Sequence, residues 1–418
     1  MSSQPKPSTT PLAAVQVPKR SRARSGQPLA PPAPPALPAP DVPTPLLGGL
    51  TPQQFMRRHW QKKPLLVRQA VPGFAPLLKR PELFALAQQD GVESRLIVRE
   101  GDDWSLASGP FKPRQLPPLK QPGWTLLVQG VDLHHDAAHQ LLQGFRFVPD
   151  ARLDDLMISW ATEGGGVGPH FDSYDVFLLQ ASGRRRWRIG RQRDLTLQPD
   201  KPLKILQHFE PEQEWVLEPG DMLYLPPEWA HDGVALDDGC MTYSVGFRVP
   251  QRAALAAELV QRLAEDWTDE SLYRDPQQRA CAHPAAVPDA LTDFAAAALQ
   301  ALLADRKGLQ LALGEVLSEP KPLVCFEPQQ QPWALGAVVL DQRTRMLYDE
   351  RCIYINGEAL RASGPDARLM RRLADRRWLK ERQVLAASPA AQAALADWYA
   401  AGWLQRAPAS RMRALMWP

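Results

Sequence analysis

The chain has 418 residues, of which 44% are hydrophobic and 23% charged, and its formal net charge is +3. The length predicts two or three folded domains, no apolar run approaches the ~20 residues that a membrane helix needs, and the small net charge indicates no specific nucleic-acid site. The four cysteines, Cys240, Cys281, Cys325 and Cys352, include no CxxC pair and are too sparse for a disulfide framework, which favours a reducing cytoplasm.

Residues 1–44 are rich in proline, and their only acidic residue is Asp41. Such a composition buries too little apolar surface to offset the loss of chain entropy, so we expect a disordered tail. Its basic residues between Lys6 and Arg24 could form a targeting arm or a weak polyanion contact. A solvated tail is the simpler interpretation.

Short apolar runs separated by turn residues dominate the region 45–250. Thr51-Pro52 can begin a helix, and residues 64–67 are typical of a strand. Further strands are expected at residues 124–129, 156–160, 176–180, 185–190, 215–217, 222–225 and 241–248. Many short strands without long helices between them indicate a closed or sandwiched antiparallel β-structure. We therefore predict a mainly β domain at 45–250.

The remaining chain has a different character. In the region 251–320, Leu255, Leu259, Leu263 and Trp267 recur at near-helical spacing, and an alanine-rich stretch follows at 290–303. This helical segment could pack on its own β domain or pair with a second copy. In the region 321–418, a hairpin at 353–360 surrounds an Asn-Gly turn, and helical patterns follow at 366–378 and 390–401. A small α+β module fits there.

Three His-x-acid motifs compete as metal ligands: His134 with Asp136, His170 with Asp172, and His208 with Glu210. On an extended backbone, residues i and i+2 point to the same face, so each motif could aim an imidazole and a carboxylate at one ion. The motif at 170 leads into a strong strand at 176–180. The motif at 134 begins an amphipathic helical pattern and the one at 208 lies in a loop, which favours solvated roles for both.

A third ligand must come from elsewhere, and His231 is the best candidate. It lies just beyond the expected strand 222–225 and the Pro226-Pro227 pair. Two histidines and one carboxylate leave three octahedral positions open, which is the facial arrangement of non-haem iron(II) oxygenases. The alternative is that His170 and His231 are two satisfied core histidines.

The expected strand at 185–190 favours the metal site over that alternative. Alternation places Arg185 on one face with Trp187 and Ile189, and leaves Arg184, Arg186 and Arg188 on the other. An inward guanidinium is very costly without a partner, so Arg185 requires an anion inside the barrel. A dicarboxylate cosubstrate would fit, and an internal Asp or Glu is the structural alternative. The glycines at 164–166 and 168 would let the backbone bend close to the site.

Four segments together resemble a known family. They are GGGVGPHFD at 164–172, YDVF at 174–177, GRRRW at 183–187 and YSVGFR at 243–248. They closely resemble the bacterial JmjC-type ribosomal oxygenases, in the branch that hydroxylates an arginine of a large-subunit ribosomal protein. The resemblance runs from about residue 46 to the C-terminus. It implies a double-stranded β-helix of the cupin/JmjC type at 45–250, a helical dimerisation segment at 251–320 and a winged-helix-like domain at 321–418.

The resemblance also implies the chemistry. His170, Asp172 and His231 would hold Fe(II), and Arg185 would bind the distal carboxylate of 2-oxoglutarate. Thr242 stands where relatives carry asparagine, which leaves open how that position contributes to cosubstrate binding. The products would be 3-hydroxyarginine, succinate and CO2, and the enzyme would be a cytoplasmic homodimer.

A cationic substrate side chain needs acidic and aromatic groups at the mouth of the site. The candidates by proximity in sequence are Glu163, Tyr174, Asp175 and Asp232. Two other functions remain open. One is an N-methyl demethylase with the same iron and cosubstrate, and the other is a non-catalytic module that binds the ribosome.

Overall fold

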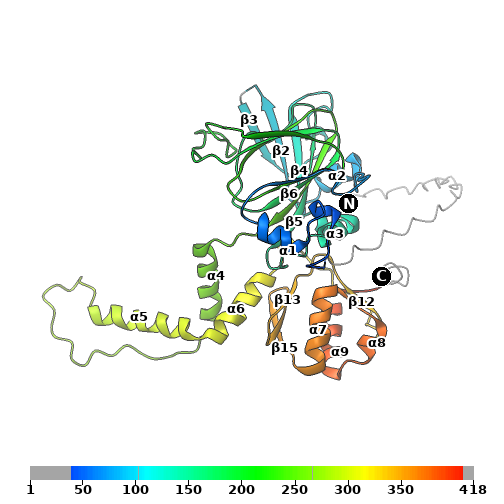
Figure 1. The fold of residues 1–418 in the computed structure, drawn as a ribbon. Coiled ribbons are helices and arrows are strands. Elements are labelled where there is room, and N and C mark those ends of the chain that lie inside the picture. Colours follow the sequence, from blue (N-terminus) through cyan, green and yellow to red (C-terminus); the bar gives the residue numbers. More distant parts are fainter. Residues whose placement is uncertain (1–38, 102, 266, 408–418) are drawn as a thin grey trace, which may run out of the picture. The chain divides into compact units, whose positions relative to one another are not determined.

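The computed structural model describes residues 39–101, 103–265 and 267–407. Residues 1–38 of the predicted tail at 1–44 lie outside the described residues. The described chain forms a β-rich core, a helical segment and a C-terminal α+β module, in that order (Figure 1). None of the helices in these ranges is long and apolar enough to cross a membrane.

The core is built from two antiparallel sheets. The large sheet contains β1 (Leu65–Val67), β9 (Met222–Leu225), β6 (Val176–Ser182), β11 (Cys240–Phe247), β5 (Leu153–Ala161), β4 (Trp124–Val128), β2 (Ser94–Glu100) and β3 (Asp103–Ser108), in that spatial order. The small sheet contains β10 (Ala230–Ala235), β7 (Arg185–Gly190) and β8 (Gln213–Leu217). Every strand that the sequence predicted in this region is present.

Helices cover one face of the large sheet. They are α1 (Pro52–Arg58), α2 (Arg80–Leu86) and α3 (Asp136–Gln143). Phe55, Leu83 and Leu142 from these helices pack into the same hydrophobic cluster as strand residues such as Phe177 and Tyr243. Helix α1 begins where the sequence predicts, because Thr51 and Gln54 form a capping box around Pro52.

The other face of the large sheet packs on the small sheet. Val176, Leu178 and Leu223 of the large sheet share a cluster with Trp187 and Ile189 of the small one. Two facing antiparallel sheets enclose a barrel interior. The fold is the cupin-type β core that the sequence predicts, and β7 and β10 line its interior with alternate residues.

The helical segment follows β11. It consists of α4 (Arg252–Glu265), α5 (Asp289–Ala304) and α6 (Arg306–Ser318). Leu263, Leu302 and Ala312, one from each helix, form a small cluster. Outside this cluster α5 exposes large apolar side chains: Leu291 (40% exposed), Phe294 (37%), Leu299 (55%) and Leu303 (49%).

The C-terminal module has its own core. Its strands are β12 (Val338–Leu340), β13 (Met346–Tyr348), β14 (Cys352–Ile355), β15 (Glu358–Arg361), β16 (Trp378–Leu379) and β17 (Leu404–Arg406), and its helices are α7 (Gly364–Arg376), α8 (Glu381–Leu385) and α9 (Pro389–Ala400). Ile353, Leu373 and Leu395 are buried together between these elements. The β14–β15 hairpin turns at Asn356 and Gly357, both at positive φ, as the Asn-Gly pair predicts.

Candidate functional site

Three side chains from two segments meet at the barrel. His170 and Asp172 lie in the loop between β5 and β6, and His231 lies on β10. The backbones of His170 and His231 form an isolated antiparallel bridge, with N–H···O distances of 2.9 and 2.8 Å. One ligand atom from each of His170, Asp172 and His231 can be chosen so that all three lie within 4.8 Å of one another. Among the described residues, this is the group of His, Cys, Asp and Glu side chains whose geometry could hold a metal ion.

Hydrogen bonds orient both imidazoles. The Nδ1 atom of His170 lies 2.8 Å from the carbonyl oxygen of Gly168, and Nδ1 of His231 lies 2.8 Å from that of Trp229. Because a carbonyl can only accept, each Nδ1 carries the proton and each Nε2 keeps its lone pair. Burial, and then the neighbouring His170, lower the pKa of His231 to about 4. His231 is therefore neutral at pH 7, as a metal ligand must be.

The glycine-rich loop lets the chain pass close to β10. A Cβ atom on Gly166 would lie 2.4 Å from the carbonyl oxygen of Gly233, a contact that no larger residue could make without moving the backbone. This is the role the sequence predicts for the glycines at 164–168. The competing motifs lie elsewhere: His134 and Asp136 flank His135, the N-cap of α3, and residues 208–210 lie in the loop between β7 and β8.

Arg185 is buried in the barrel interior. Its residue is 4% exposed, and Ala235, its β10 partner, lies on the same strand face as His231. Its Nη1 donates to the carbonyl oxygen of Gly233 at 3.1 Å, whereas Nε and Nη2 are buried without a partner. No carboxylate within the described ranges forms an ion pair with it, so the internal Asp or Glu that the sequence left open is not there.

Trp187 lies between Arg185 and the metal cluster. The Arg185 guanidinium is 5.8 Å from the Trp187 ring centroid, and the Trp187 ring is 5.9 Å from that of His231. Arg185, Trp187 and His231 therefore form one continuous inward face. The candidate metal site lies at one end of this face, and the Arg185 guanidinium, with its unpartnered Nε and Nη2, lies at the other.

The comparisons with known proteins agree with this geometry. A JmjC domain model matches residues 140–255, and a ROXA-like winged-helix model matches residues 301–405. The ribosomal protein uL16 3-hydroxylase of Escherichia coli is 36% identical over 280 residues, which are 67% of this chain and 74% of that protein. This chain belongs to the JmjC ribosomal oxygenases.

Two further relatives support the assignment. A probable ribosomal oxygenase of Haemophilus influenzae is 38% identical over 211 residues, 49% of this chain and 52% of that protein. The structure of YcfD, a ribosomal oxygenase from Escherichia coli, in complex with cobalt and 2-oxoglutarate matches with a TM-score of 0.73 at 32% identity, over 85% of this chain and 98% of that one.

The residues of this ribosomal oxygenase fit an iron ion and 2-oxoglutarate. Two neutral imidazoles and one carboxylate are the donor set that non-haem iron(II) prefers, and they leave positions open for other ligands. The unpartnered Nε and Nη2 of Arg185 match the geometry of a carboxylate, which accepts two parallel N–H bonds. Both ends of a short dicarboxylate would therefore find a partner within one barrel.

Thr242 lies on β11 in the same oxygenase barrel and is 2% exposed. Its hydroxyl donates to Oε1 of Gln180 on β6 at 2.9 Å. The Gln180 side chain, fully buried, donates in turn to the carbonyl oxygens of Ser182 and Gly183. Sequence reasoning missed Gln180, because a single glutamine in an apolar strand carries no spacing signal. The Thr242 hydroxyl is committed to Gln180, although its oxygen can still accept a hydrogen bond.

Two of the four residues expected at the mouth are not there. Asp175 is fully buried and accepts hydrogen bonds from Tyr224 (2.6 Å) and Gln61 (2.9 Å), with Arg152 at 3.7 Å. Asp232 is 3% exposed and pairs with Arg188 at 2.6 Å. Because β10 is a strand, Asp232 points away from the face that carries His231. Both carboxylates stabilise the fold and are already satisfied.

The other two candidates remain accessible. Glu163 is exposed immediately after β5. Tyr174 is 39% exposed, and its side chain is hydrogen-bonded to the Asp172 carboxylate. Burial, and then that carboxylate, raise the pKa of Tyr174, so its hydroxyl stays protonated and can donate.

Proposed function

We propose that this ribosomal oxygenase is a 2-oxoglutarate- and Fe(II)-dependent hydroxylase acting on an arginine of a large-subunit ribosomal protein. One observation carries the proposal: the His170, Asp172 and His231 cluster shares a barrel face with the buried, unpartnered fork of Arg185. The uL16 3-hydroxylase relative supports the choice of substrate class. The expected products are 3-hydroxyarginine, succinate and CO2.

The protein residues have distinct roles in this reaction. When bound, iron(II) would activate O2, one oxygen atom of which would enter a substrate C–H bond while the other would oxidise 2-oxoglutarate to succinate and CO2. His170, Asp172 and His231 would hold the ion, with the Nδ1 hydrogen bonds fixing the direction of both imidazoles. Arg185 would bind the distal carboxylate, and Thr242 would lie beside the cosubstrate on β11. The apolar cluster of Val176, Trp187 and Ile189 would exclude water.

Glu163 and Tyr174 are the proposed substrate contacts. The Glu163 carboxylate is exposed and could pair with a guanidinium, and the partly exposed ring of Tyr174, hydrogen-bonded to Asp172, offers a stacking face. Asp175 and Asp232 are left out of the proposal because their oxygens already have partners.

The test uses the purified full chain with iron(II), 2-oxoglutarate and isolated large ribosomal subunits. Hydroxylation adds about 16 Da to one ribosomal protein, whereas a demethylase would remove about 14 Da per methyl group. His170→Ala should abolish succinate release while the protein remains folded. Unchanged succinate release from His170→Ala would contradict the proposal. If the protein were a ribosome-binding module without catalysis, neither wild type nor His170→Ala would release succinate.

We also propose a homodimer formed through α5. Leu291, Phe294, Leu299 and Leu303 lie on one half of that helix and are 37–55% exposed, an apolar surface that a second copy could cover. Leu299→Asp should convert a dimer to a monomer in light scattering. Ala297→Asp, about 160° away around the helix axis, is the matched control.

We further propose domain boundaries near residues 45, 250 and 320. A cytoplasmic location, where the ribosomal substrate is found, completes the proposal.

A further inference from the structure

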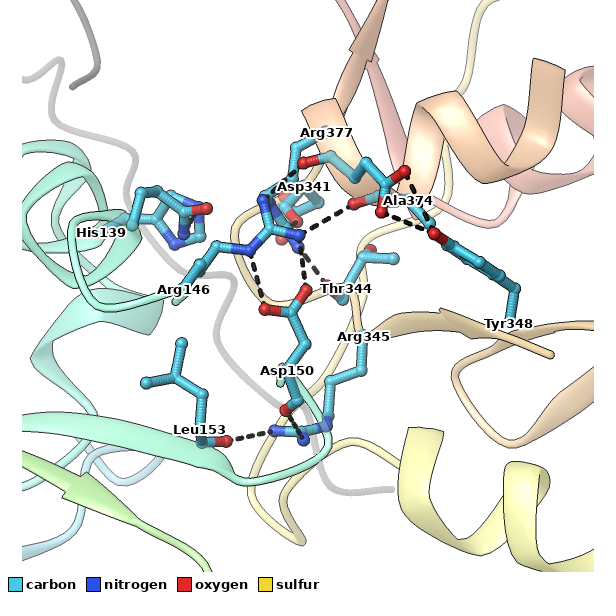
Figure 2. A network of polar contacts seen from close by, with 12 residues as sticks. His139, Arg146, Asp150, Leu153, Asp341, Thr344, Arg345, Tyr348, Ala374 and Arg377 are labelled. Carbon is cyan, nitrogen blue, oxygen red and sulfur yellow. Dashed lines mark hydrogen bonds and ion pairs between the residues drawn. The ribbon is translucent and has the colours of Figure 1, made fainter. Parts of the chain in front are cut away.

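A polar cavity lies between the β core and the C-terminal module. The cavity has a volume of about 70 Å3 and is partly open to solvent. The core contributes residues that follow α3, including Arg146 and Asp150, and the module contributes residues 342–347 and Arg377. Figure 2 shows that the arginine side chains of both parts converge on this region. It is separate from the candidate metal site, none of whose residues lines it.

Two partly buried arginines in this cavity have no carboxylate within ion-pair distance in the part of the chain that the structure describes. Arg345 donates only to the backbone carbonyls of Leu153 (3.5 Å) and Asp150 (3.2 Å), and its Nε is buried without a partner. Arg377 donates to the backbone carbonyls of Asp341 (2.8 Å) and Thr344 (3.0 Å). Within the described ranges, neither guanidinium forms an ion pair with a carboxylate. Burial lowers the pKa of both to about 10, which leaves both charged at neutral pH.

The neighbouring carboxylates are already engaged by other cations. Both oxygens of Asp150 accept from Arg146, at 2.7 and 2.5 Å. Asp154 is shared between Lys321 (3.1 Å) and Arg248 (3.2 Å).

A third carboxyl group adds little negative charge. Asp132 lines the same cavity and is fully buried, and burial, followed by the charge of Asp155, raises its pKa to about 7. It is therefore largely uncharged on the acidic side of neutrality and only partly charged near pH 7. The cavity retains an excess of positive charge.

Removing an unpaired guanidinium from water is costly, and a multidentate oxyanion is the partner that its planar fork fits best. We propose that this cavity binds a small phosphate-type oxyanion between Arg345 and Arg377. Bound there, the anion contacts residues of the C-terminal module beside Arg146 of the core, and so stabilises their junction. Anion binding would strengthen the attachment of the C-terminal module to the core. It would not involve the candidate iron site.

The experiment measures the Tm of the full chain against inorganic phosphate, with potassium chloride at matched ionic strength as the reference. Wild type should show a saturable rise in Tm, and phosphorus NMR should report binding over the same range. Arg345→Met should fold, because replacing an uncompensated buried charge by an apolar side chain is often neutral or stabilising. It should bind phosphate roughly tenfold more weakly or worse, since it loses charge-assisted hydrogen bonds.

Two further variants complete the test. Arg345→Lys keeps the charge but loses the fork, and should also lose most of the phosphate response. Arg361→Met, on the exposed edge of β15, should respond as wild type does. No saturable response in wild type would overturn the proposal. An equal response in wild type, Arg345→Met and Arg345→Lys would overturn it too, because phosphate would then bind elsewhere, for instance at Arg185.

Discussion

At the scale of single residues, Arg185 separates cosubstrate binding from metal binding. Its Nε and Nη2 are unpartnered, and it contacts none of the three candidate ligands. We expect Arg185→Ala to weaken 2-oxoglutarate binding roughly 100-fold, since two charge-assisted hydrogen bonds are lost. Iron binding should be unchanged. Calorimetric titration of the metal-free protein with the metal ion, and of the metal-loaded protein with 2-oxoglutarate, measures the two affinities. Arg184→Ala, exposed and paired with Asp237, is the control. Unaltered 2-oxoglutarate affinity in Arg185→Ala would refute the assignment.

Asp132 predicts a pH dependence of stability. Its pKa in the folded protein is about 7, against a usual 3.8, because the carboxyl is fully buried and lies near Asp155. Between these values the folded chain binds more protons at Asp132 than the unfolded one, so the contribution of Asp132 to stability is greatest below pH ~4 and falls as pH rises through this window. The free energy of unfolding from this residue should fall by about 3 kcal/mol between pH 4 and 7.

Urea titrations across that pH range test the effect. Asp132→Asn keeps the acceptor for the Leu156 N–H at 2.8 Å but cannot ionise, so its profile should lack this loss. If the free energy of unfolding changed in parallel with pH in wild type and Asp132→Asn, a group other than Asp132 would control the pH dependence between pH 4 and 7.

At the scale of elements, the sequence predicts best where turn residues bound a strand, as Ser182-Gly183 does before β7 and Pro226-Pro227 after β9. The expected strands at 185–190 and 222–225 match β7 and β9 to the residue. Strand β10, Ala-His-Asp-Gly-Val-Ala, was missed because glycine, alanine and aspartate dominate it and only one residue is β-branched. That omission explains why Asp232 was expected at the mouth of the site, since only a strand puts it on the face opposite His231.

The packing of β10 on β7 gives a prediction about Gly233. A Cβ atom there would lie 2.6 Å from the Trp187 ring, which in turn faces His231. Gly233→Ala must move that ring, so we expect a loss of about 1–3 kcal/mol of stability together with weaker iron binding. Denaturant unfolding and metal competition measure the two effects. Gly246→Ala on β11 is the control, because a Cβ atom there would lie 3.7 Å from an Asp155 carboxylate oxygen, an ordinary contact distance. Equal effects from both substitutions would contradict the packing argument.

At the scale of the whole molecule, the order of core, helices and C-terminal module follows from the resemblance, and the gathering of His170, Asp172 and His231 was predicted from strand positions. The junction between core and module was not predictable. It joins Arg146 and Asp150 to Arg345 and Arg377, which lie about 200 residues further along the chain, and most of its bonds end on backbone carbonyls that carry no sequence signal.

Arg146 is the residue through which this junction can be tested without an added ligand. It binds both oxygens of Asp150 and donates to the carbonyls of Ala374 and Asp375, the last turn of α7 (Figure 2). Its side chain is only 8% exposed. Its positive charge also interacts favourably with the negative C-terminal end of the α7 dipole. Arg146→Ala should cost about 1–3 kcal/mol, less than a fully buried pair because Asp150 can be rehydrated.

That loss should be local rather than uniform. Hydrogen exchange should accelerate in the last turn of α7 and around Asp150, while β6 and β11 keep their protection, because opening the junction does not require unfolding the barrel. Arg361→Ala, on the exposed edge of β15, should leave the exchange pattern unchanged. If Arg146→Ala accelerated exchange equally in β11 and α7, core and module would unfold as one cooperative unit, and the junction would not be a separable element of this molecule.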